Sequence, residues 1–446
     1  MRRVLSAAVL VVILFAIRAS ATQNPPKDMS KDAQAFIEML QKQEFAKIQT
    51  LFTDQMKAAL PEDKLKATWS TLVMQAGAFK QQRGARTEMV GNMQRVTVTC
   101  DFERAPLDFV VAYNPAGLIG GFNVRPYTPP APPWSAPAYA DATKFTESEI
   151  TVGAPNWPLP GTLTMPVGVG PFPAIVLVHG SGPNDRDETI GPNKTFKDLA
   201  LGLASRGIAV LRYDKRSNVA GAKMAAIANM TVKEEVVDDA VAAVAFLRTR
   251  PKIDPARVVV LGHSLGGMLI PRIGAGDAKI AGLISMAGAT GELAPTMARQ
   301  SRYLAEADGR ITADEQKQID TMEQLAKTVA ALSPADATTP AAIQGAPASY
   351  WLDLRGYDPA TAAKSLKQPL LVLQGERDYQ VTMADDFVKW KAALGGNPNV
   401  TFHTYPTLNH LFMPGVGKSL PAEYEKPGHV PVDVINDIAG WISTIK

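Results

Sequence analysis

The chain has 446 residues, of which 46% are hydrophobic and 20% charged, a globular composition in a chain too long for one ordinary domain. Its formal net charge is +3 and its basic residues form no block, which argues against a nucleic-acid partner. A single cysteine excludes an internal disulfide, and the absence of metal-binding and nucleotide-binding motifs predicts an enzyme or binding protein without metal or other cofactor.

The first 21 residues have the features of a secretory signal peptide. Residues 1–3 (Met-Arg-Arg) form a basic start, residues 4–17 form an apolar run, and residues 19–21 (Ala-Ser-Ala) fit a cleavage site. The apolar run is shorter than the ~20 residues that a membrane span needs, which disfavours an uncleaved anchor. We therefore expect an exported protein, periplasmic or extracellular, that starts at Thr22 and keeps no stable membrane anchor.

Residues 30–125 are predicted to form a small α+β domain in which helices precede an antiparallel sheet. Apolar residues recur at helical spacing up to about residue 80, and strands with turn signals follow from Gly84 to Val124. One predicted strand has an apolar face made of Val96, Val98, Cys100 and Phe102. We therefore interpret Cys100 as a buried core thiol and not as a reactive one.

Prolines crowd residues 126–137, which is typical of a semi-rigid linker, and the pattern changes in residues 138–446. There, a predicted hairpin is followed by short apolar strands that alternate with helices. The predicted strands are 145–152, 159–165, 174–178, 208–211, 258–261, 283–286, 370–373 and 400–405, and the predicted helices are 196–204, 232–247 and 383–394. Alternating βα units predict an α/β fold with a doubly wound, mostly parallel sheet and helices on both faces.

The stretch Gly262-His263-Ser264-Leu265-Gly266 fits the nucleophile-elbow pattern G-x-S-x-G. A strand without polar residues precedes it and a helix-compatible run follows, so Ser264 would stand on a sharp strand-to-helix turn with its hydroxyl exposed. The pattern alone occurs often by chance, and the alternative is an idle serine in a glycine-rich turn. The strand and helix around it favour the interpretation of Ser264 as a nucleophile.

A serine nucleophile needs a base in hydrogen-bond reach, and that base needs a carboxylate to orient it. After a nucleophile elbow, the acid precedes the histidine in the chain. His410 falls in the loop after the last predicted strand and is the predicted base, with a structural loop histidine as the alternative. Asp378, three residues past the glycine that ends a strand, is the predicted acid in preference to Glu376 and Asp385. A helix-capping or ion-paired aspartate is the alternative for Asp378.

Two backbone N–H groups should form an oxyanion hole where negative charge develops. One is expected from Leu265, directly after the nucleophile, and the other from Ser181 in the loop after the strand at 174–178. Gly180 and Gly182 flank Ser181 and would let a substrate approach the backbone closely. We predict that these two glycines, together with His263, contact the substrate.

Three other features are expected near the site. Charged runs at 184–188 and 212–216 end two strands and form either solvated loops or a paired network lining the pocket. Between residues 292 and 365 the βα alternation stops, and amphipathic helices at 299–307 and 313–332 predict a helical cap. Near the end of this cap, an aromatic pair is predicted either to line the substrate pocket or to anchor the cap, namely Tyr350 and Trp351.

With the loop 179–183 (His-Gly-Ser-Gly-Pro), the charged run at 212–216, the elbow, Asp378 and His410 in this order, residues 145–446 resemble the α/β-hydrolase superfamily. They are most similar to exported bacterial esterases and serine peptidases related to dienelactone hydrolase and prolyl oligopeptidase. The resemblance implies a catalytic triad formed by Ser264, Asp378 and His410.

Residues 30–125 resemble the small cystatin-like or nuclear-transport-factor-like domain of unknown function that precedes some of these hydrolases. We therefore expect a two-domain serine hydrolase that cleaves small-molecule carboxylic esters through an acyl-enzyme intermediate. A serine peptidase is the alternative, because the same groups cleave amides. The oligomeric state stays open at this stage.

Overall fold

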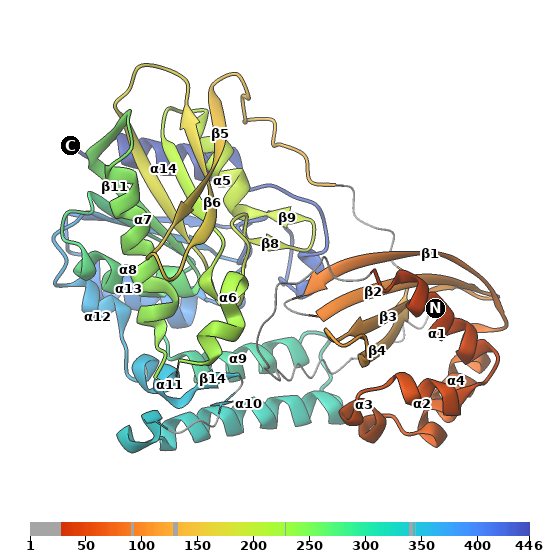
Figure 1. Ribbon diagram of the computed structural model, residues 1–446. Helices are drawn as coiled ribbons and strands as arrows, with labels where there is room; N and C mark the ends of the chain where they lie inside the picture. Colours follow the sequence, from red (N-terminus) through yellow and green to blue (C-terminus); the bar gives the residue numbers. More distant parts are fainter. Residues whose placement is uncertain (1–27, 91–92, 128–132, 228, 339–341, 344) are drawn as a thin grey trace. The chain divides into compact units, whose positions relative to one another are not determined.

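The computed structural model describes residues 28–446 except 91–92, 128–132, 228, 339–341 and 344. The predicted signal peptide and the middle of the predicted linker lie outside the described residues. The chain divides into two compact units, residues 1–130 and residues 131–446 (Figure 1). In the described part of the chain, no helix combines the length and the apolar character needed to cross a membrane.

The first unit consists of helices followed by a four-stranded antiparallel sheet in the order β1-β2-β3-β4 (Figure 1). The helices are α1 (Ser30–Gln41), α2 (Phe45–Leu51), α3 (Asp54–Ala59) and α4 (Glu62–Ala76). The strands are β1 (Phe79–Val90), β2 (Met93–Phe102), β3 (Pro106–Tyr113) and β4 (Ile119–Pro126). The predicted order of helices and then strands is confirmed.

Aromatic side chains from the helices and the sheet dominate the core of the first unit. Trp69 lies 6.3 Å from both Phe102 and Phe109, between ring centroids, and Phe102 stacks on Phe109 at 5.9 Å. Cys100 is fully buried in the same core, and burial raises the pKa of its thiol to about 12. A thiol in this environment stays protonated near neutral pH, as the sequence interpretation of Cys100 requires.

The second unit is built on an eight-stranded sheet in the order β16-β15-β12-β11-β7-β10-β6-β5. The hairpin of β5 and β6 is antiparallel and pairs antiparallel with β10, and the other strand pairs are parallel. The strands are β5 (Phe145–Val152), β6 (Leu159–Pro166), β7 (Phe172–Val178), β10 (Ala209–Tyr213), β11 (Ile253–His263), β12 (Gly282–Met286), β15 (Leu370–Gly375) and β16 (Val400–Tyr405). The predicted doubly wound, mostly parallel sheet is confirmed.

Helices cover both faces of this sheet, which is why its inner strands are continuous apolar runs. In β7, Val176 packs into the core on one face and Ile175 into the core on the other. The first core is closed by α7 (Asp238–Arg248), α8 (Leu265–Gly276) and α13 (Val388–Leu394), and the second by α5 (Thr195–Ala204) and α14 (Val432–Ser443). The π-helical turns η1 (Lys233–Val237) and η3 (Met383–Phe387) precede α7 and α13.

Short elements occupy several of the loops between these strands and helices. They are β8 (Thr189–Ile190), β9 (Asn193–Lys194), α6 (Arg216–Ala225) and η4 (Pro421–Glu423). The β8–β9 hairpin and α6 follow β7 and β10, the two strands whose carboxyl ends carry the charged runs of the sequence. These loops therefore lie at the edge of the sheet where parallel α/β folds place their sites.

The predicted helical insertion lies between β12 and β15. Its elements are α9 (Leu293–Ala305), α10 (Ala313–Ala331), η2 (Pro334–Thr338), β13 (Ala342–Ile343), β14 (Ala346–Pro347), α11 (Ala348–Leu354) and α12 (Pro359–Ala363). Helix α9 begins earlier than the predicted residue 299, because Pro295 lies in the first turn, where proline costs no helix hydrogen bond. Leu325 and Val329 of α10 pack with Trp351 in a small core that the insertion forms for itself.

Candidate active site

Ser264 occupies the sharp turn between β11 and α8, with φ 55° and ψ −115°. This left-handed conformation is costly for a residue with a side chain, and the surrounding packing holds it. A Cβ atom on Gly262 would collide with the backbone of Gly266, and one on Gly266 would collide with the backbone of Val178. The two glycines of the elbow are therefore required by close backbone approach, and they leave Ser264 partly exposed.

Ser264, His410 and Asp378 lie in one hydrogen-bonded line. The Nε2 atom of His410 is 3.0 Å from Ser264 Oγ, and its Nδ1 atom is 2.7 Å from Asp378 Oδ2. An Nδ1–H that donates to the carboxylate leaves Nε2 free to accept a proton from the serine hydroxyl. The structure thus brings together the three side chains that the sequence predicts from three separate loops.

The carboxylate of Asp378 is held by the loop that follows β15. Its Oδ1 atom accepts the N–H groups of Gln380 and Val381 at 2.8 and 3.0 Å, and its Oδ2 atom accepts Gln374 Nε2 at 3.3 Å. The side chain is fully buried and bonded at both oxygens. These hydrogen bonds fix the carboxylate in the orientation that points Oδ2 at His410.

His263, a predicted substrate contact, is 2% exposed and supports two loops instead. Its Nε2 atom is 2.9 Å from the carbonyl oxygen of His410, and its Nδ1 atom is 3.0 Å from Glu188 Oε2. The contact between His263 Nδ1 and Glu188 Oε2 is close enough for an ion pair, but its geometry does not form a hydrogen bond. The structure therefore does not place His263 among the groups that are open to a substrate.

Glu188 and His263 are both buried, and each stabilises the charged form of the other. Burial disfavours the protonated ring of His263, but the carboxylate of Glu188, the carbonyl oxygen of His410 and Asp378 together raise the pKa of His263. Burial likewise opposes ionisation of Glu188, and His263 outweighs it, so the pKa of Glu188 is lowered. A buried charge without its partner is strongly unfavourable, so the two residues should act as a unit.

Gly180, in the loop after β7, is held at both of its backbone polar groups. Its N–H donates to Glu188 Oε1 at 2.8 Å, and its carbonyl oxygen accepts Lys215 Nζ at 2.8 Å. A Cβ atom at this position would lie 3.0 Å from Ser264 Cβ, so Gly180 packs directly against the nucleophile. Because its N–H is engaged by Glu188, Gly180 does not supply an oxyanion donor.

The two oxyanion donors, the N–H groups of Leu265 and Ser181, stay a prediction. Leu265 is the first residue of α8, so its N–H has no acceptor within the helix. Ser181 directly follows Gly180, and Gly182 next to it has φ 90°, a conformation that favours glycine. Leu265 directly follows Ser264 in the chain, and Ser181 belongs to the loop whose Gly180 packs against Ser264.

Lys215, Glu235 and Tyr350 form a second buried polar group that sequence reasoning did not assign. Lys215 is 2% exposed, and its Nζ atom lies 3.1 Å from Glu235 Oε1. The hydroxyl of Tyr350 donates to Glu235 Oε2 at 2.9 Å. Burial opposes ionisation of Glu235, but Lys215 outweighs it and lowers the pKa of the carboxyl. The signals in the sequence were the charged run at 212–216, which contains Lys215, and an acidic residue beside the valines of η1.

The charged runs at 184–188 and 212–216 are paired and not freely solvated. Arg186 and Asp214 form a two-pronged ion pair at 2.9 and 3.1 Å, and Arg212 contacts Asp187. Asp187 also accepts Lys194 Nζ at 2.8 Å. Of the two interpretations of these runs, the paired network is the one that the structure favours.

Helix α9 of the insertion lies against the loop that carries Asp378. Arg299 and Gln300 both donate to the carbonyl oxygen of Gln380 at 3.1 Å. Tyr303 stacks on Tyr379, with ring centroids 5.0 Å apart and planes 6° apart. The predicted position of the insertion, near the catalytic loops, is consistent with these contacts.

Tyr350 and Trp351 serve as anchors of the insertion. Tyr350 is 8% exposed and its hydroxyl is engaged by Glu235. Trp351 is 4% exposed, packs in the core of the insertion, and donates its Nε1–H to the carbonyl oxygen of Ile343 at 2.9 Å. Of the two roles predicted for this pair, the structure favours anchoring over lining of a pocket.

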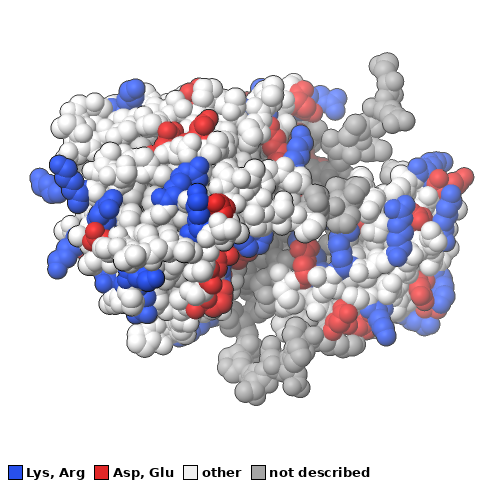
Figure 2. Space-filling model, turned by 90° about the horizontal axis from the view of Figure 1, so that it is seen from above, with Lys and Arg blue, Asp and Glu red and all other residues white. Residues whose placement is uncertain are grey.

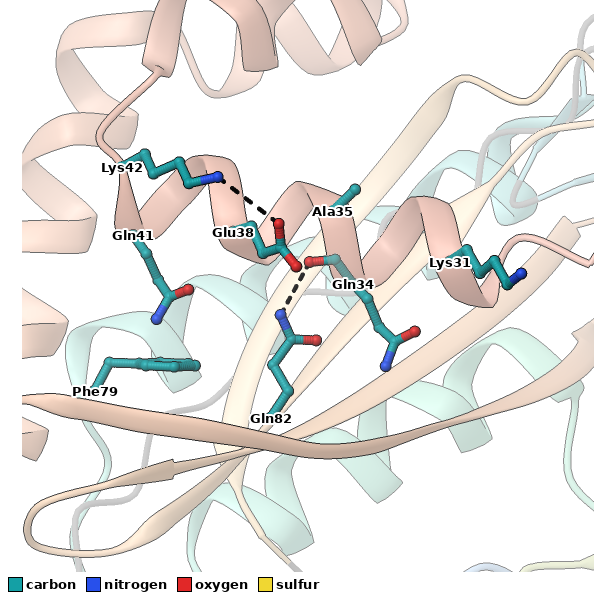
Figure 3. Close-up of a pocket in the computed structure, with 8 residues that line it drawn as sticks. All are labelled: Lys31, Gln34, Ala35, Glu38, Gln41, Lys42, Phe79 and Gln82. Atoms are coloured by element: carbon teal, nitrogen blue, oxygen red, sulfur yellow. Dashed lines mark hydrogen bonds and ion pairs between the residues drawn. The ribbon is translucent and has the colours of Figure 1, made fainter.

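An open groove of about 580 Å³ lies between α1 and β1 of the first unit (Figure 3). Across it, Gln82 Nε2 donates a hydrogen bond of 3.0 Å to the carbonyl oxygen of Gln34. The lining consists of Lys31, Gln34, Ala35, Glu38, Gln41, Lys42, Phe79 and Gln82. It brings no nucleophile and base together, so Ser264 and its neighbours remain the candidate active site.

On the face that Figure 2 shows, each unit carries charged side chains of both signs. Within the described residues, no cluster of three or more His, Cys, Asp or Glu side chains is placed to hold a metal ion. Ser264 and His410 are side chains of the kind that supply nucleophilic and acid–base chemistry.

Comparison with known proteins finds a family match in each part of the chain. Residues 175–425 match the alpha/beta hydrolase family, and residues 33–122 match DUF3887, a family described as protein of unknown function. The chain is 39% identical over 412 residues to Esterase EstD of Thermotoga maritima, which covers 92% of this chain and 95% of that protein.

Two solved structures are among those that the chain matches. Est1E from Butyrivibrio proteoclasticus is 15% identical with a TM-score of 0.42, covering 66% of this chain and 99% of that one. A hyperthermophilic esterase from Pyrobaculum calidifontis is 16% identical with a TM-score of 0.42, covering 68% of this chain and 87% of that one.

The family match covers more than half of the chain, and it contains the elbow, the acid loop and the histidine loop. The match to the Thermotoga protein extends over nearly the full length of both chains. The chain belongs to the alpha/beta hydrolase family. A small domain of the predicted kind, helices followed by an antiparallel sheet, precedes the hydrolase unit.

Proposed function

We propose that this protein is a carboxylic ester hydrolase whose nucleophile, base and orienting acid are Ser264, His410 and Asp378. The observation that carries the proposal is the line of hydrogen bonds from Ser264 Oγ through His410 to Asp378, at 3.0 and 2.7 Å. It begins at a strained elbow that exposes the hydroxyl, which is the arrangement that acyl transfer by serine needs. The name of the Thermotoga relative, an esterase, supports an ester as the bond that is cleaved.

The geometry supports a two-step reaction. Ser264 Oγ attacks the acyl carbon while His410 Nε2 takes the hydroxyl proton, and the buried carboxylate of Asp378 stabilises the resulting imidazolium. The N–H groups of Ser181 and Leu265 bind the oxyanion of the tetrahedral intermediate. The alcohol leaves with the proton from His410, and an acyl group stays on Ser264. A water molecule, deprotonated by His410, then releases the acid.

The insertion has a proposed role in choosing the substrate. Helix α9 contacts the loop of Asp378 through Tyr303 and Gln300, so it borders the site from the side of the acid. We propose that it shapes the space for the acyl or the alcohol group of a small-molecule ester. Exchanging Gln300 for Leu should change the ratio of kcat/KM between short-chain and long-chain esters, and an unchanged ratio would contradict this role.

Export is also part of the proposal. The basic start, apolar run and Ala-Ser-Ala site of residues 1–21 support removal of these residues during secretion. The intact mass of the protein recovered from a secreting host should match a chain that begins at Thr22. A mass that includes residue 1 would contradict it.

The decisive experiment compares the wild type with Ser264→Ala on p-nitrophenyl esters and on matched peptide p-nitroanilides. We expect the variant to lose turnover by about 10⁴-fold or more with folding intact, because the members of a triad act as a unit. A fluorophosphonate probe should label Ser264 in the wild type. Ser443→Ala, at the end of α14, is the matched control and should behave as the wild type.

Two results would contradict the proposed function. One is normal turnover by Ser264→Ala, and the other is labelling of a different serine by the probe. Faster cleavage of the p-nitroanilides than of the esters would instead favour a serine peptidase with the same residues.

A further inference from the structure

The peptide group between Gly180 and Ser181 carries one of the two N–H groups assigned to the oxyanion hole. In a trans peptide the C=O and the next N–H lie in one plane and point in opposite directions. A group that holds the carbonyl oxygen of Gly180 therefore also sets the direction of the N–H of Ser181. The structure places a buried ammonium there, with Lys215 Nζ 2.8 Å from that oxygen.

We propose that Lys215 is a positioning residue for the oxyanion hole, which holds the carbonyl of Gly180 and thereby directs the N–H of Ser181 toward the substrate oxygen. The inference rests on the proposed function and deepens it. Gly180 packs against the Ser264 side chain, so this peptide lies beside the reacting atoms. Lys215 contacts this peptide at the carbonyl oxygen of Gly180, and it acts on the N–H of Ser181 through the peptide plane.

The loop needs an external hold, because its own sequence gives it little rigidity. Gly180 and Gly182 lack a Cβ atom, and glycine has the largest conformational freedom of all residues. Asn184 Nδ2 also reaches the carbonyl oxygen of Gly180, at 3.2 Å, but it is shared with the carbonyl oxygens of Ser181 and Gly182. A hydrogen bond from a charged donor is about twice as strong as a neutral one, so the contact with Lys215 dominates.

The position of Lys215 is in turn fixed from the insertion. Glu235 of η1 pairs with Lys215 at 3.1 Å, and the hydroxyl of Tyr350 in α11 holds the other oxygen of that carboxylate at 2.9 Å. All three side chains are less than 10% exposed, so water does not compete for these contacts. A continuous polar path thus leads from the end of the insertion to the oxyanion loop.

The test is the double variant Lys215→Met/Glu235→Gln, which removes both charges of the pair. Removing Lys215 alone would leave Glu235 as an uncompensated buried charge, which endangers folding. We expect kcat to fall by about 10²-fold, the typical cost of an oxyanion donor, with KM changed by less than about threefold. The dissociation constant of a trifluoromethyl ketone, which forms a tetrahedral adduct with serine, should rise in parallel. Binding of an unreactive ketone analogue should stay the same.

The matched control is Arg216→Met/Asp239→Asn. Arg216 follows Lys215 in the chain, and its guanidinium forms a buried ion pair with Asp239 at 2.9 Å without contacting the oxyanion loop. The control loses a buried pair from the same region, and thermal unfolding of both variants reports the loss of stability. Its kcat and its affinity for the trifluoromethyl ketone should stay near the wild-type values.

Tyr350→Phe provides a second variant that keeps both charges of the Lys215–Glu235 pair. In this variant, kcat and the affinity for the trifluoromethyl ketone should fall by the same factor as each other. That factor should be smaller than the one in the double variant. Wild-type kcat in the double variant, or equal losses in the double variant and in the control, would overturn the role of Lys215. Failure of the proposed function is distinguishable, because it would show in the wild type as labelling of a serine other than Ser264.

Discussion

The two units of this protein bury different kinds of side chain. The described core of the first unit is apolar and aromatic, and its buried polar side chains are Gln94, Thr97, Thr99 and Asp108. The second unit buries many charged side chains, among them Asp187, Glu188, Arg212, Lys215, Arg216, Glu235, Asp239, His263, Asp378, Asp386 and His410. Ionised groups are costly to bury, so their concentration in one unit requires a reason beyond stability.

That reason is the position of these charges. Glu188 and Lys215 hold the peptide groups on either side of Gly180, and His263 holds the backbone of His410. These three buried side chains therefore end on loops that carry part of the proposed catalytic machinery. The first unit, by contrast, satisfies the carboxylate of Asp108 within its own sheet through Thr99 and Arg86. Buried charge that is directed at loops separates a catalytic unit from a structural one.

The strongest test of this contrast removes the charge that orients His410. We expect Asp378→Asn to lower kcat by about 10⁴-fold, because an amide facing Nδ1 favours the tautomer whose Nε2 is protonated. Such a ring does not accept the proton of Ser264. Asp385→Asn is the matched control, since Asp385 lies in the same segment but pairs with Arg299 at 2.6 Å. Similar losses in both variants would contradict the assignment of the acid.

A smaller loss of activity is expected when the pair of Glu188 and His263 is broken. Glu188→Gln should lower kcat by about tenfold to a hundredfold, because small displacements of the loops of Gly180 and His410 misplace reacting groups. Steady-state kinetics at fixed pH would measure it. An unchanged kcat would show that the oxyanion and histidine loops hold their positions without this pair.

The same variant gives a pH-dependent signature in stability. The pKa of His263 is raised in the folded state, so its stabilising charge is fully present below its unfolded pKa and is lost as pH rises through the folded value. The pKa of Glu188 is lowered, so its contribution is present above its unfolded pKa and is lost as pH falls through the folded value. The difference in melting temperature between the wild type and Glu188→Gln should therefore become smaller at low pH and at high pH. A difference that is constant with pH would argue against the ion pair.

The smallest effect on activity is expected from removal of the first unit. None of the proposed catalytic residues lies in residues 30–125, and the eight strands of the hydrolase sheet all come from residues 145–405. Because linked domains with modest contacts usually fold separately, residues 138–446 should hydrolyse a small soluble ester with nearly the wild-type kcat. A folded fragment whose kcat is lowered a hundredfold would show that the first unit completes the active site.

Local sequence signals determined the elements that position the site. Ser264 was found because an apolar strand, two glycines and a helix-compatible run occupy adjacent positions, and each constrains the backbone over a few residues. Asp378 and His410 were found because each follows a strand in the order that the fold requires. The doubly wound sheet followed from the alternation of apolar strands and amphipathic helices, whose periods are properties of short segments.

Tertiary structure alone decided how the buried charges pair. Glu188 and His263 are far apart in the sequence, as are Glu235 and Tyr350, and no local pattern shows which strand ends and loops meet. For the same reason the sequence placed His263 near the substrate, although the fold turns its ring between Glu188 and the backbone of His410. Backbone conformation depends on short-range sterics and hydrophobic periodicity, which a sequence displays directly. The partners of a buried charge depend on long-range packing, which exists only in the folded chain.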